Sequence, residues 1–347
     1  MRVFRTDLSR LIQQVSKAVE ARNTIPILAC VKLVLSDGKL TATATDLDIE
    51  ITGTIEAQGD DAAFCVDAKR LAGIVAKLTG ESLEITPADN RVAIKSGRSR
   101  FLLDALPAAD YPDISAGGFD IEFRADLAAL FAPVAFAIST EETRYYLNGI
   151  NMEPGIVTAT DGHRLATLKT EAWPDHKPVI VPRKTVSLAP KGEIAVSLSP
   201  ARIRMEAGGV TITSKLIDGT FPDYERVIPK QNSKAIVVDN ATLRAAAERV
   251  AVISSERGRS LRLSAAGGAL ALRVNNPGAG EADDEIECEY SGEPIHIGFN
   301  VAYLVDALGS MPDGEVVLRL ADPATPALLT SPAAPDMRIV CMPMRVG

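Results

Sequence analysis

The sequence predicts an α+β protein in which one unit of about 115 residues is repeated three times. Three observations support this prediction. The apolar face of an amphipathic helix recurs three times along the chain, a hairpin turn follows each face at a similar distance, and a second helix-like segment follows each hairpin. The element order expected for each unit is β-α-β-β-β-α-β-β-β.

The first helix of each unit is predicted by apolar residues that recur at i, i+3, i+4 and i+7. Each of these helices has a polar residue near its start that suits an N-cap, such as Asp7, Asp126 or Asn240. We expect the second helix to continue to Ile138, through Pro133. The three apolar faces consist of Leu8, Leu11, Ile12, Val15 and Val19; of Leu127, Leu130, Phe131, Val134 and Ile138; and of Leu243, Ala246, Ala247 and Val250.

Turn signals place the hairpins and the second helices. Glycine-containing pairs favour tight turns between strands because glycine accepts positive φ. Hairpin turns are expected at residues 37–38, 154–155 and 267–268, second helices or turns at 66–78, 181–186 and 299–311, and second hairpin turns at 89–90, 208–209 and near 322–323. Polar or glycine-rich stretches between the units predict domains at residues 1–117, 118–233 and 234–347.

Composition and charge narrow the function classes. The chain is 46% hydrophobic, 24% charged and 5% aromatic, which indicates a globular protein and not a disordered one. Its net charge of −8 has the wrong sign for tight binding to nucleic acid by counterion release. Any contact with DNA is therefore expected to be local and weak.

The sequence contains no motif typical of a metal-binding, nucleotide-binding, secreted or membrane-spanning protein. Cys30, Cys65, Cys288 and Cys341 are scattered, which predicts reduced thiols in a cytoplasmic protein and no metal site. There is no phosphate-binding glycine loop, so we expect neither a cofactor nor ATP hydrolysis. The N-terminal residues have helix spacing and lack the apolar core of a signal peptide. The longest nearly uncharged run, residues 127–140, is too short to span a membrane.

The candidate functional site is the turn formed by Asp161, Gly162, His163 and Arg164. It follows an alternating run typical of a strand, so its polar side chains would be presented at a strand end beside leucines. Three interpretations stay open at this point. The turn could be purely structural, it could bind a peptide, or His163 and Asp161 could form part of a hydrolase site, although no serine or cysteine nucleophile motif accompanies them.

Six segments resemble one family. ATDGHRLA (159–166), TRYYLNG (143–149), VIVPRK (179–184), TSKLIDGTFPDYERVIPK (213–230), GFNVAYL (298–304) and the terminal CMPMRVG, together with the triplication, resemble the bacterial DNA polymerase III beta subunit, the sliding clamp. The resemblance implies a head-to-tail homodimer that forms a ring, with antiparallel sheets outside and helices inside, around duplex DNA of any sequence. It also implies no catalytic activity and no cofactor. The implied partners are an ATP-driven clamp loader, the DNA polymerase III alpha subunit and other proteins with clamp-binding motifs.

The resemblance also implies three sets of site residues. Deformable methionines and an apolar cup suit the binding of varied peptides. The implied peptide-binding residues are Leu147, Thr160, Gly162, His163, Arg164, Leu165, Pro222, Arg226, Val227, Asn300, Tyr303, Val340, Met342, Pro343, Met344 and Arg345. The DNA-binding residues are Arg10, Gln13, Lys17, Arg22, Lys69, Arg70, Lys77, Arg144, Tyr145, Arg244 and Arg249. The dimer interface pairs the basic Arg98 and Arg100 with the acidic Asp284 and Glu285, beside the apolar Val252 and Ile253.

Two alternatives to the replicative sliding clamp stay open. Gly258 and the terminal Val346 and Gly347 depart from the family pattern at the pocket, and the second helix of the middle unit is short. An accessory or mobile-element paralogue of the clamp with altered partner preference would account for these departures. A monomeric peptide-binding module is a further possibility, which a mass measurement in solution would detect.

Overall fold

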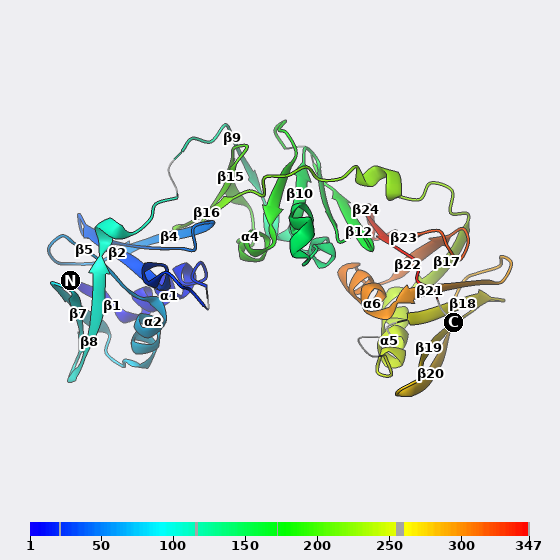
Figure 1. Ribbon diagram of the computed structural model, residues 1–347, viewed down its shortest axis with the longest axis horizontal. Coiled ribbons are helices and arrows are strands. Elements are labelled where there is room, and N and C mark those ends of the chain that lie inside the picture. Colours follow the sequence, from blue (N-terminus) through cyan, green and yellow to red (C-terminus); the bar gives the residue numbers. More distant parts are fainter. Residues whose placement is uncertain (21, 115–116, 172, 255–259, 346–347) are drawn as a thin grey trace. The chain divides into compact units, whose positions relative to one another are not determined.

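A computed structural model describes residues 1–20, 22–114, 117–171, 173–254 and 260–345, so the departures at Gly258, Val346 and Gly347 lie outside the described residues (Figure 1). Contacts divide the chain into two compact units. Unit 1 comprises Met1–Asp126 and Leu188–Leu216, and unit 2 comprises Leu127–Ser187 and Ile217–Gly347. None of the described helices is both long and apolar enough to cross a membrane.

The predicted triplication is confirmed, with one strand more per copy than expected. The described elements follow the order β-α-β-β-β-β-α-β-β-β three times, starting at β1, β9 and β17. The additional strand in each copy, β5, β13 or β21, lies immediately before the second helix, and only its last residues overlap the segment that the sequence analysis assigned to that helix. Domain boundaries at residues 117 and 233 stay a prediction.

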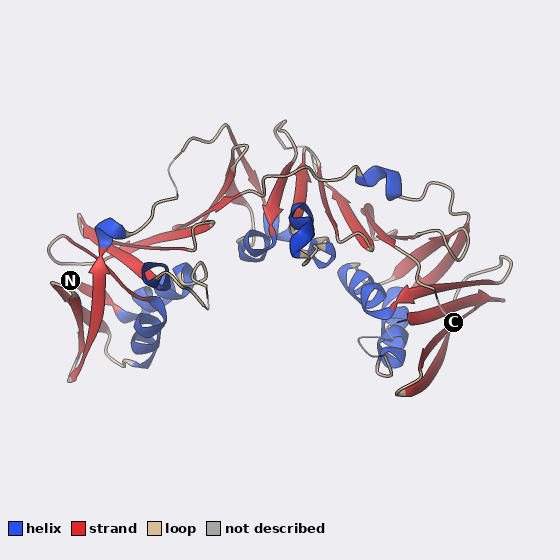
Figure 2. Cartoon of the chain, viewed as in Figure 1, coloured by secondary structure: helices blue, strands red, loops and turns tan. Residues whose placement is uncertain are grey.

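Unit 1 contains one antiparallel sheet with the order β1-β6-β7-β8-β5-β2-β3-β4-β16-β15-β14-β9. Helices α1 and α2 pack against each other, and α1 covers β3 and β4 (Figure 2). The elements are β1 Arg2–Phe4, α1 Arg5–Val15, β2 Cys30–Ser36, β3 Lys39–Thr45, β4 Ile49–Glu56, β5 Ala62–Asp67, α2 Ala68–Lys77, β6 Ser82–Ala88, β7 Arg91–Ser96, β8 Ser99–Pro107, β9 Ile121–Ala125, β14 Ile194–Leu198, β15 Arg202–Ala207 and β16 Val210–Lys215, with short 3-10 turns at Pro26–Ala29 (η1) and Ala108–Asp110 (η2).

Unit 2 contains two antiparallel sheets, with the orders β13-β10-β11-β12-β24-β23-β22-β17 and β20-β19-β18-β21. Helices α5 and α6 pack together, and α5 covers β19 and β20. The elements are α3 Leu127–Phe131, η3 Ala135–Ala137, η4 Glu142–Leu147, β10 Gly149–Glu153, β11 Ile156–Thr160, β12 Arg164–Lys169, β13 Val179–Pro182, α4 Arg183–Leu188, η5 Tyr224–Val227, β17 Lys234–Asp239, α5 Asn240–Ala251, β18 Ser260–Ala266, β19 Ala269–Asn276, β20 Gly280–Glu287, β21 Ile295–Asn300, α6 Val301–Ser310, β22 Glu315–Leu320, β23 Ala327–Ser331 and β24 Ala334–Cys341.

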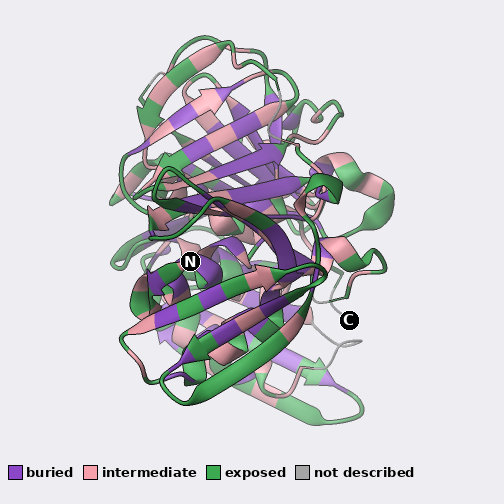
Figure 3. Cartoon of the chain, turned by 90° about the vertical axis from the view of Figure 1, so that its left-hand side faces the viewer, coloured by how far each residue is buried: buried purple, intermediate pink, exposed green. Residues whose placement is uncertain are grey.

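The predicted hairpin turns form as their residues require. Asp37 and Gly38 have φ of 51° and 74°, and the flanking Ser36 and Lys39 are paired, which fits a two-residue hairpin whose twist suits the strands. The turns at residues 154–155 and 267–268 likewise join adjacent paired strands. In β2, β18 and β19 buried residues alternate with more exposed ones, so that one face of these strands forms the core, whereas β10 and β11 are buried along nearly their whole length (Figure 3).

The helix predicted over residues 127–138 is wrong in extent. Helix α3 ends at Phe131, and a turn and the 3-10 segment η3 follow. Pro133 lacks an N–H and its ring clashes with the preceding turn, so it ends the helix despite the apolar spacing. Of the predicted apolar face, Leu127, Phe131, Val134 and Ile138 are nevertheless buried, and Leu130 is half-buried.

Candidate functional site

The turn between β11 and β12 is held by side-chain to backbone hydrogen bonds. The Asp161 carboxylate accepts hydrogen bonds from the N–H groups of His163 (2.8 Å) and Arg164 (2.9 Å). The Thr160 hydroxyl accepts from the N–H of Gly162 (3.1 Å) and donates to the carbonyl of Arg164 (2.8 Å). Gly162 has φ of +87°, which suits glycine. The turn therefore has little freedom, and the Asp161 carboxylate is engaged by main-chain N–H groups.

Arg164 is the side chain that this turn fixes in place. Its Nε lies 3.1 Å from the Asp161 carboxylate and its Nη1 2.6 Å from that of Asp306 in α6. The guanidinium lies 4.4 Å from the ring centroid of Tyr303 and 5.2 Å from that of Phe136. Only 11% of the Arg164 side chain is exposed, because its guanidinium pairs with two carboxylates and lies against two aromatic rings.

A cavity of about 310 Å³ lies beside this turn, and its wall is mainly apolar. Leu147, Leu165 and Val340 are buried in its floor, while Val227 and Met342 are exposed at its margin. Its size is at the lower end of the range for ligand pockets, which suits a few apolar side chains of a peptide. The lining comprises Arg144, Tyr146, Leu147, Thr160, Gly162, Arg164, Leu165, Pro222, Asp223, Tyr224, Val227, Val340 and Met342.

Other members of the predicted peptide-binding set lie outside this lining. The ring of His163 lies 6.0 Å from that of Tyr303, and its carbonyl accepts a hydrogen bond from Met342. Asn300 caps α6 by accepting from the N–H of Ala302. Arg226 is exposed and paired with Asp223, while Pro343, Met344 and Arg345 follow the end of β24.

Four lining residues and one supporting residue were not in the predicted set. Tyr146, Asp223 and Tyr224 line the cavity, and Asp306 holds Arg164 from behind it. Arg144 was expected at DNA, yet it lines this cavity: its Nη1 would lie 2.5 Å from a Cβ at Gly162. Of these five residues, only Asp223 and Tyr224 had a signal in the sequence, because they belong to a Pro-Asp-Tyr turn segment.

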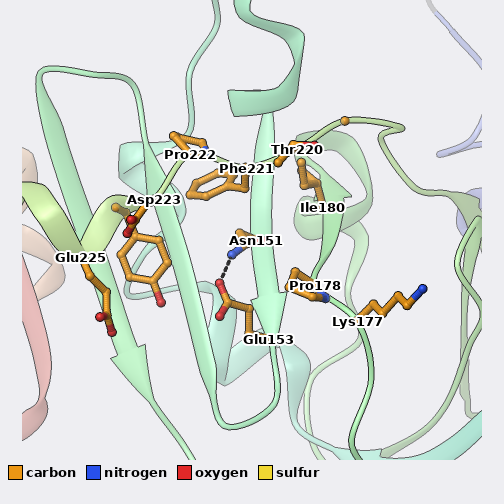
Figure 4. A pocket seen from close by; sticks show the side chains of 12 residues that line it. Asn151, Glu153, Lys177, Pro178, Ile180, Thr220, Phe221, Pro222, Asp223 and Glu225 are labelled. Atoms are coloured by element: carbon orange, nitrogen blue, oxygen red, sulfur yellow. Dashed lines mark hydrogen bonds between the residues drawn. The ribbon is translucent and has the colours of Figure 1, made fainter.

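A second hollow, of about 540 Å³, adjoins the first and shares Pro222, Asp223 and Tyr224 with it (Figure 4). Its wall is more polar. The buried Asn151 donates from its amide to the Glu153 carboxylate, and the amide oxygen of Asn151 has no hydrogen-bond partner among the described residues. Apart from Pro222, this hollow is lined by residues that the sequence analysis did not select.

The residues predicted to contact DNA come from both units. In unit 1 they lie on and just after α1 and on α2, and in unit 2 they lie on η4 and α5. All are exposed except the half-buried Arg144. Several are already paired with acidic neighbours, as Arg10 is with Asp7 (2.9 Å) and Arg244 with Glu248 (2.9 Å). Such local pairs weaken the attraction of these faces for phosphate.

The predicted interface residues lie on exposed edges. Val252 follows α5 with 80% of its area exposed, and Asp284 and Glu285 lie in β20. Arg98 and Arg100 lie in the turn after β7 and in β8. Asp284 is already paired with Arg249, 2.7 Å away. No group of His, Cys, Asp and Glu residues suited to a metal ion occurs within the part of the chain that the structure describes.

Comparison with known proteins gives a consistent result over the whole chain. Family models match residues 1–115 as the N-terminal domain of the DNA polymerase III beta subunit, 124–223 as its central domain and 225–345 as its C-terminal domain. A beta sliding clamp of Caulobacter vibrioides is 42% identical, over 99% of both chains. A solved DnaN sliding clamp from Bartonella birtlesii bound to griselimycin is 38% identical with a TM-score of 0.96, covering 100% of this chain and 99% of that one. A clamp from Caulobacter crescentus is 40% identical with a TM-score of 0.95, covering 99% of each chain.

Proposed function

This chain belongs to the DNA polymerase III beta subunit family, and from that premise we propose that it is the sliding clamp of the replicative polymerase. It is a non-catalytic subunit that encircles duplex DNA and tethers polymerases and repair factors to it. Head-to-tail dimerisation closes the ring, and a clamp loader supplies the ATP-dependent step. The proposed site of action is the cytoplasm.

The observation that carries the peptide-binding part of the proposal is the mainly apolar cavity beside the rigid turn. Leu147, Leu165 and Val340 provide an apolar floor, and Met342 provides a side chain that adapts to different partners. The hydrogen bonds of Asp161 fix Arg164, so the cavity keeps its shape in the absence of a ligand. A preformed cavity of this kind binds short apolar motifs without paying a large ordering cost.

DNA is held by enclosure and not by strong attraction. A net charge of −8 disfavours tight electrostatic binding, which would slow sliding. The exposed cations on α1, α2, η4 and α5 are proposed to contact phosphates weakly, partly through water. Contacts of this kind carry no sequence information, so the clamp accepts any duplex.

Retention on DNA tests enclosure directly. After loading by a clamp loader, the protein should stay on nicked circular DNA through gel filtration and dissociate after the circle is linearised. Its mass in solution at micromolar concentration should be that of two chains. Equal loss from circular and linear DNA, or a single-chain mass, would contradict the proposal.

Binding of partners tests the pocket. Leu165→Asp places a charge in the apolar floor and should abolish binding of both the DNA polymerase III alpha subunit and griselimycin. Ala333→Asp is the control, because the exposed Ala333 lies outside the cavity lining, and the same new charge there should leave both affinities unchanged. If the alpha subunit still bound the Leu165→Asp variant, partners would use another surface.

A further inference from the structure

The second hollow of unit 2 has a wall that suits a cation. Its volume of about 540 Å³ lies within the usual range for ligand pockets. Strand β10, the residues that lead into β13 and the segment 219–225 form this wall, and all of them belong to unit 2. Apart from Pro222, none of the lining residues belongs to the sets predicted to bind peptides or DNA or to form the dimer interface. The hollow therefore needs an explanation of its own.

Strand β10 places Asn151 and Glu153 on the same face of its sheet, because alternate residues of a strand point the same way. Asn151 lies in the middle of this sheet, paired with Ile180 on one side and Thr158 on the other, and only 2% of it is exposed. Its amide donates a hydrogen bond to the Glu153 carboxylate, as Figure 4 shows. The buried amide therefore fixes the direction of this carboxylate within the hollow.

The amide oxygen of Asn151 has no hydrogen-bond partner among the described residues, although it is buried. A buried acceptor without a donor costs free energy, and native structures rarely retain one. The terminal torsion of an asparagine side chain is broad, so a small rotation presents this oxygen to a donor in the hollow. The site thus favours a ligand that donates hydrogen bonds.

Glu153 adds a negative charge that its own chain does not neutralise. The residue is half-buried, and no lysine, arginine or histidine of the described chain lies within ion-pair distance of its carboxylate. One carboxylate oxygen receives the Asn151 amide, which leaves the other to accept hydrogen bonds from a ligand. Charges that are partly withdrawn from water are usually paired, so a cation is the expected ligand of this carboxylate.

Carboxylates outnumber cations in the wall. Glu153, Asp223 and Glu225 line the hollow, against Lys177 alone. Lys177 is exposed, and Figure 4 shows its side chain extending away from Glu153. Asp223 already pairs with Arg226, 2.6 Å away, whereas Glu225 has no ion-pair partner in the part of the chain that the structure describes. The hollow therefore attracts positive charge.

Two aromatic rings complete the wall. Phe221 is half-buried, and its ring centroid lies 6.3 Å from that of the buried Tyr224 in an edge-to-face arrangement. The face of an aromatic ring attracts a cation, and a planar guanidinium can stack on it. The wall thus offers hydrogen-bond acceptors, negative charge and aromatic surface to the same ligand.

These features together match a guanidinium group. It is planar and always charged, and its several N–H groups can donate to the Glu153 carboxylate and to the Asn151 amide oxygen at once. It is also less strongly hydrated than an ammonium group, so a half-buried hollow admits it more readily. We propose that the second hollow binds the side chain of an arginine in the partner peptide whose apolar residues occupy the first cavity.

The two sites are close enough for one peptide to reach both. They share Pro222, Asp223 and Tyr224, so the segment 222–224 forms part of both walls. An extended peptide advances about 3.3–3.6 Å per residue and an arginine side chain adds further reach, so an arginine a few residues from the apolar motif suffices. This inference rests on the proposed peptide-binding function and extends it: a flanking arginine distinguishes partners that have the same apolar motif.

Peptides that differ in a single residue test the proposal. The clamp-binding segment of the DNA polymerase III alpha subunit is synthesised alone, and with an arginine joined at either end through one to three glycines. In the matched peptides citrulline replaces this arginine, because citrulline keeps the shape and loses the charge. At least one arginine peptide should bind about tenfold more tightly than its citrulline counterpart by isothermal titration calorimetry. Equal affinities at every linker length and at both ends would overturn the proposal.

Two variants of the protein locate the contact. Glu153→Gln keeps the shape of the side chain and an acceptor for the Asn151 amide, and it should reduce the preference for arginine below about twofold. Glu315→Gln is the matched control, because it removes the same charge from an exposed residue of β22 outside the hollow, and it should retain the preference. The unextended peptide should bind both variants as it binds the parent. A preference that survived Glu153→Gln, or that fell equally in the control, would contradict a direct contact with Glu153.

The sole tryptophan gives a measurement that needs no peptide motif. The indole N–H of Trp173 donates to the main-chain carbonyl of Glu153, 2.8 Å away. N-acetylarginine methylamide should therefore change the emission of Trp173 in a saturable manner, whereas the citrulline analogue at the same concentrations should not. The change should be lost in Glu153→Gln. Identical responses to the two compounds would contradict the selection of a guanidinium.

The outcomes separate this site from the proposed function. If the unextended peptide failed to bind the parent protein, the peptide-binding role of the first cavity would be contradicted, while the Trp173 titration would still decide whether the second hollow takes a guanidinium. A saturable titration together with equal affinities of arginine and citrulline peptides would show that the cation comes from elsewhere. That result would overturn the assignment to the partner peptide.

Discussion

Arg164 and Asp306 form an ion pair of 2.6 Å although 142 residues separate them in the chain. The pair joins the turn before β12 to helix α6, and so it connects the wall of the candidate peptide pocket to the helix behind it. Arg164 is also held by Asp161, and its guanidinium stacks on Tyr303. Pocket shape and local stability therefore depend on the same side chain.

Arg164→Ala should destabilise unit 2 by about 2–4 kcal/mol, because it leaves the mostly buried Asp161 carboxylate without its cation and opens space against Tyr303. Trp173, the sole tryptophan, belongs to unit 2, so its fluorescence during urea unfolding reports the change. Arg226→Ala is the matched control: Arg226 also pairs with an aspartate three residues away, but 83% of its side chain is exposed. The control should show no measurable change, and equal shifts would contradict a special role for Arg164.

Gly162→Ala should weaken binding of griselimycin and of the polymerase alpha subunit. Its φ of +87° disfavours alanine, and the new Cβ would lie 2.5 Å from Nη1 of Arg144, which must move out of the cavity wall. Gly192→Ala is a matched control, because Gly192 has nearly the same φ, +86°, and no atom within 4 Å of the added Cβ. Both variants share a backbone strain of about 1–2 kcal/mol, so thermal stability should fall in both.

Only the variant at Gly162 should lose affinity, as measured by isothermal titration calorimetry. If Gly192→Ala weakened binding as much, the effect would arise from global destabilisation and not from the displaced Arg144.

Glu50→Gln should stabilise unit 1 at neutral pH. Glu50 is buried where β4 joins β16, and this burial raises the pKa of its carboxyl above the usual value. An acid whose pKa is raised by folding keeps its proton in the folded state while the unfolded state loses it, so stability falls as pH rises from the unfolded pKa through the folded pKa. Glutamine removes this loss and can still accept the hydrogen bond from the N–H of Ile114.

The melting temperature of Glu50→Gln should therefore exceed that of the parent at pH 8, and the difference should vanish near pH 3, where both states of the parent are protonated. A difference that stayed constant with pH would show that the substitution acts through packing and not through ionisation.

The elements that the sequence predicted best depend on neighbouring residues. Leu8, Leu11, Ile12 and Val15 form one buried face of α1, and the turn of Asp37 and Gly38 joins β2 to β3, because both patterns are local. The helix expected to reach Ile138 ended at Phe131, since the local effect of Pro133 outweighed the apolar spacing.

Contacts between distant segments were not predictable from one sequence. Asp306 meets Arg164 only because β12 pairs with β24 and α6 packs beside this junction, and no local pattern encodes that pairing. Tyr224 and Arg144 likewise line one cavity although they lie far apart in the sequence. The resemblance to a family supplied most of the predicted pocket residues, whereas the supporting residues required the structure.

In the native protein Cys288 should be the first thiol to react with iodoacetamide at pH 8. Burial raises the pKa of Cys30 to about 11 and that of Cys65 and Cys341 to about 12, so very little thiolate is present, and all three side chains are also shielded from the reagent. Cys288 is half-buried, and burial raises its pKa as well, so its reaction should be slow but detectable. Peptide mass spectrometry after timed labelling assigns the sites. Cys288→Ser should remove the native-state labelling, and unfolding in urea should expose the other three. Rapid labelling of Cys341 in the native protein would contradict the close packing of β24 behind the pocket.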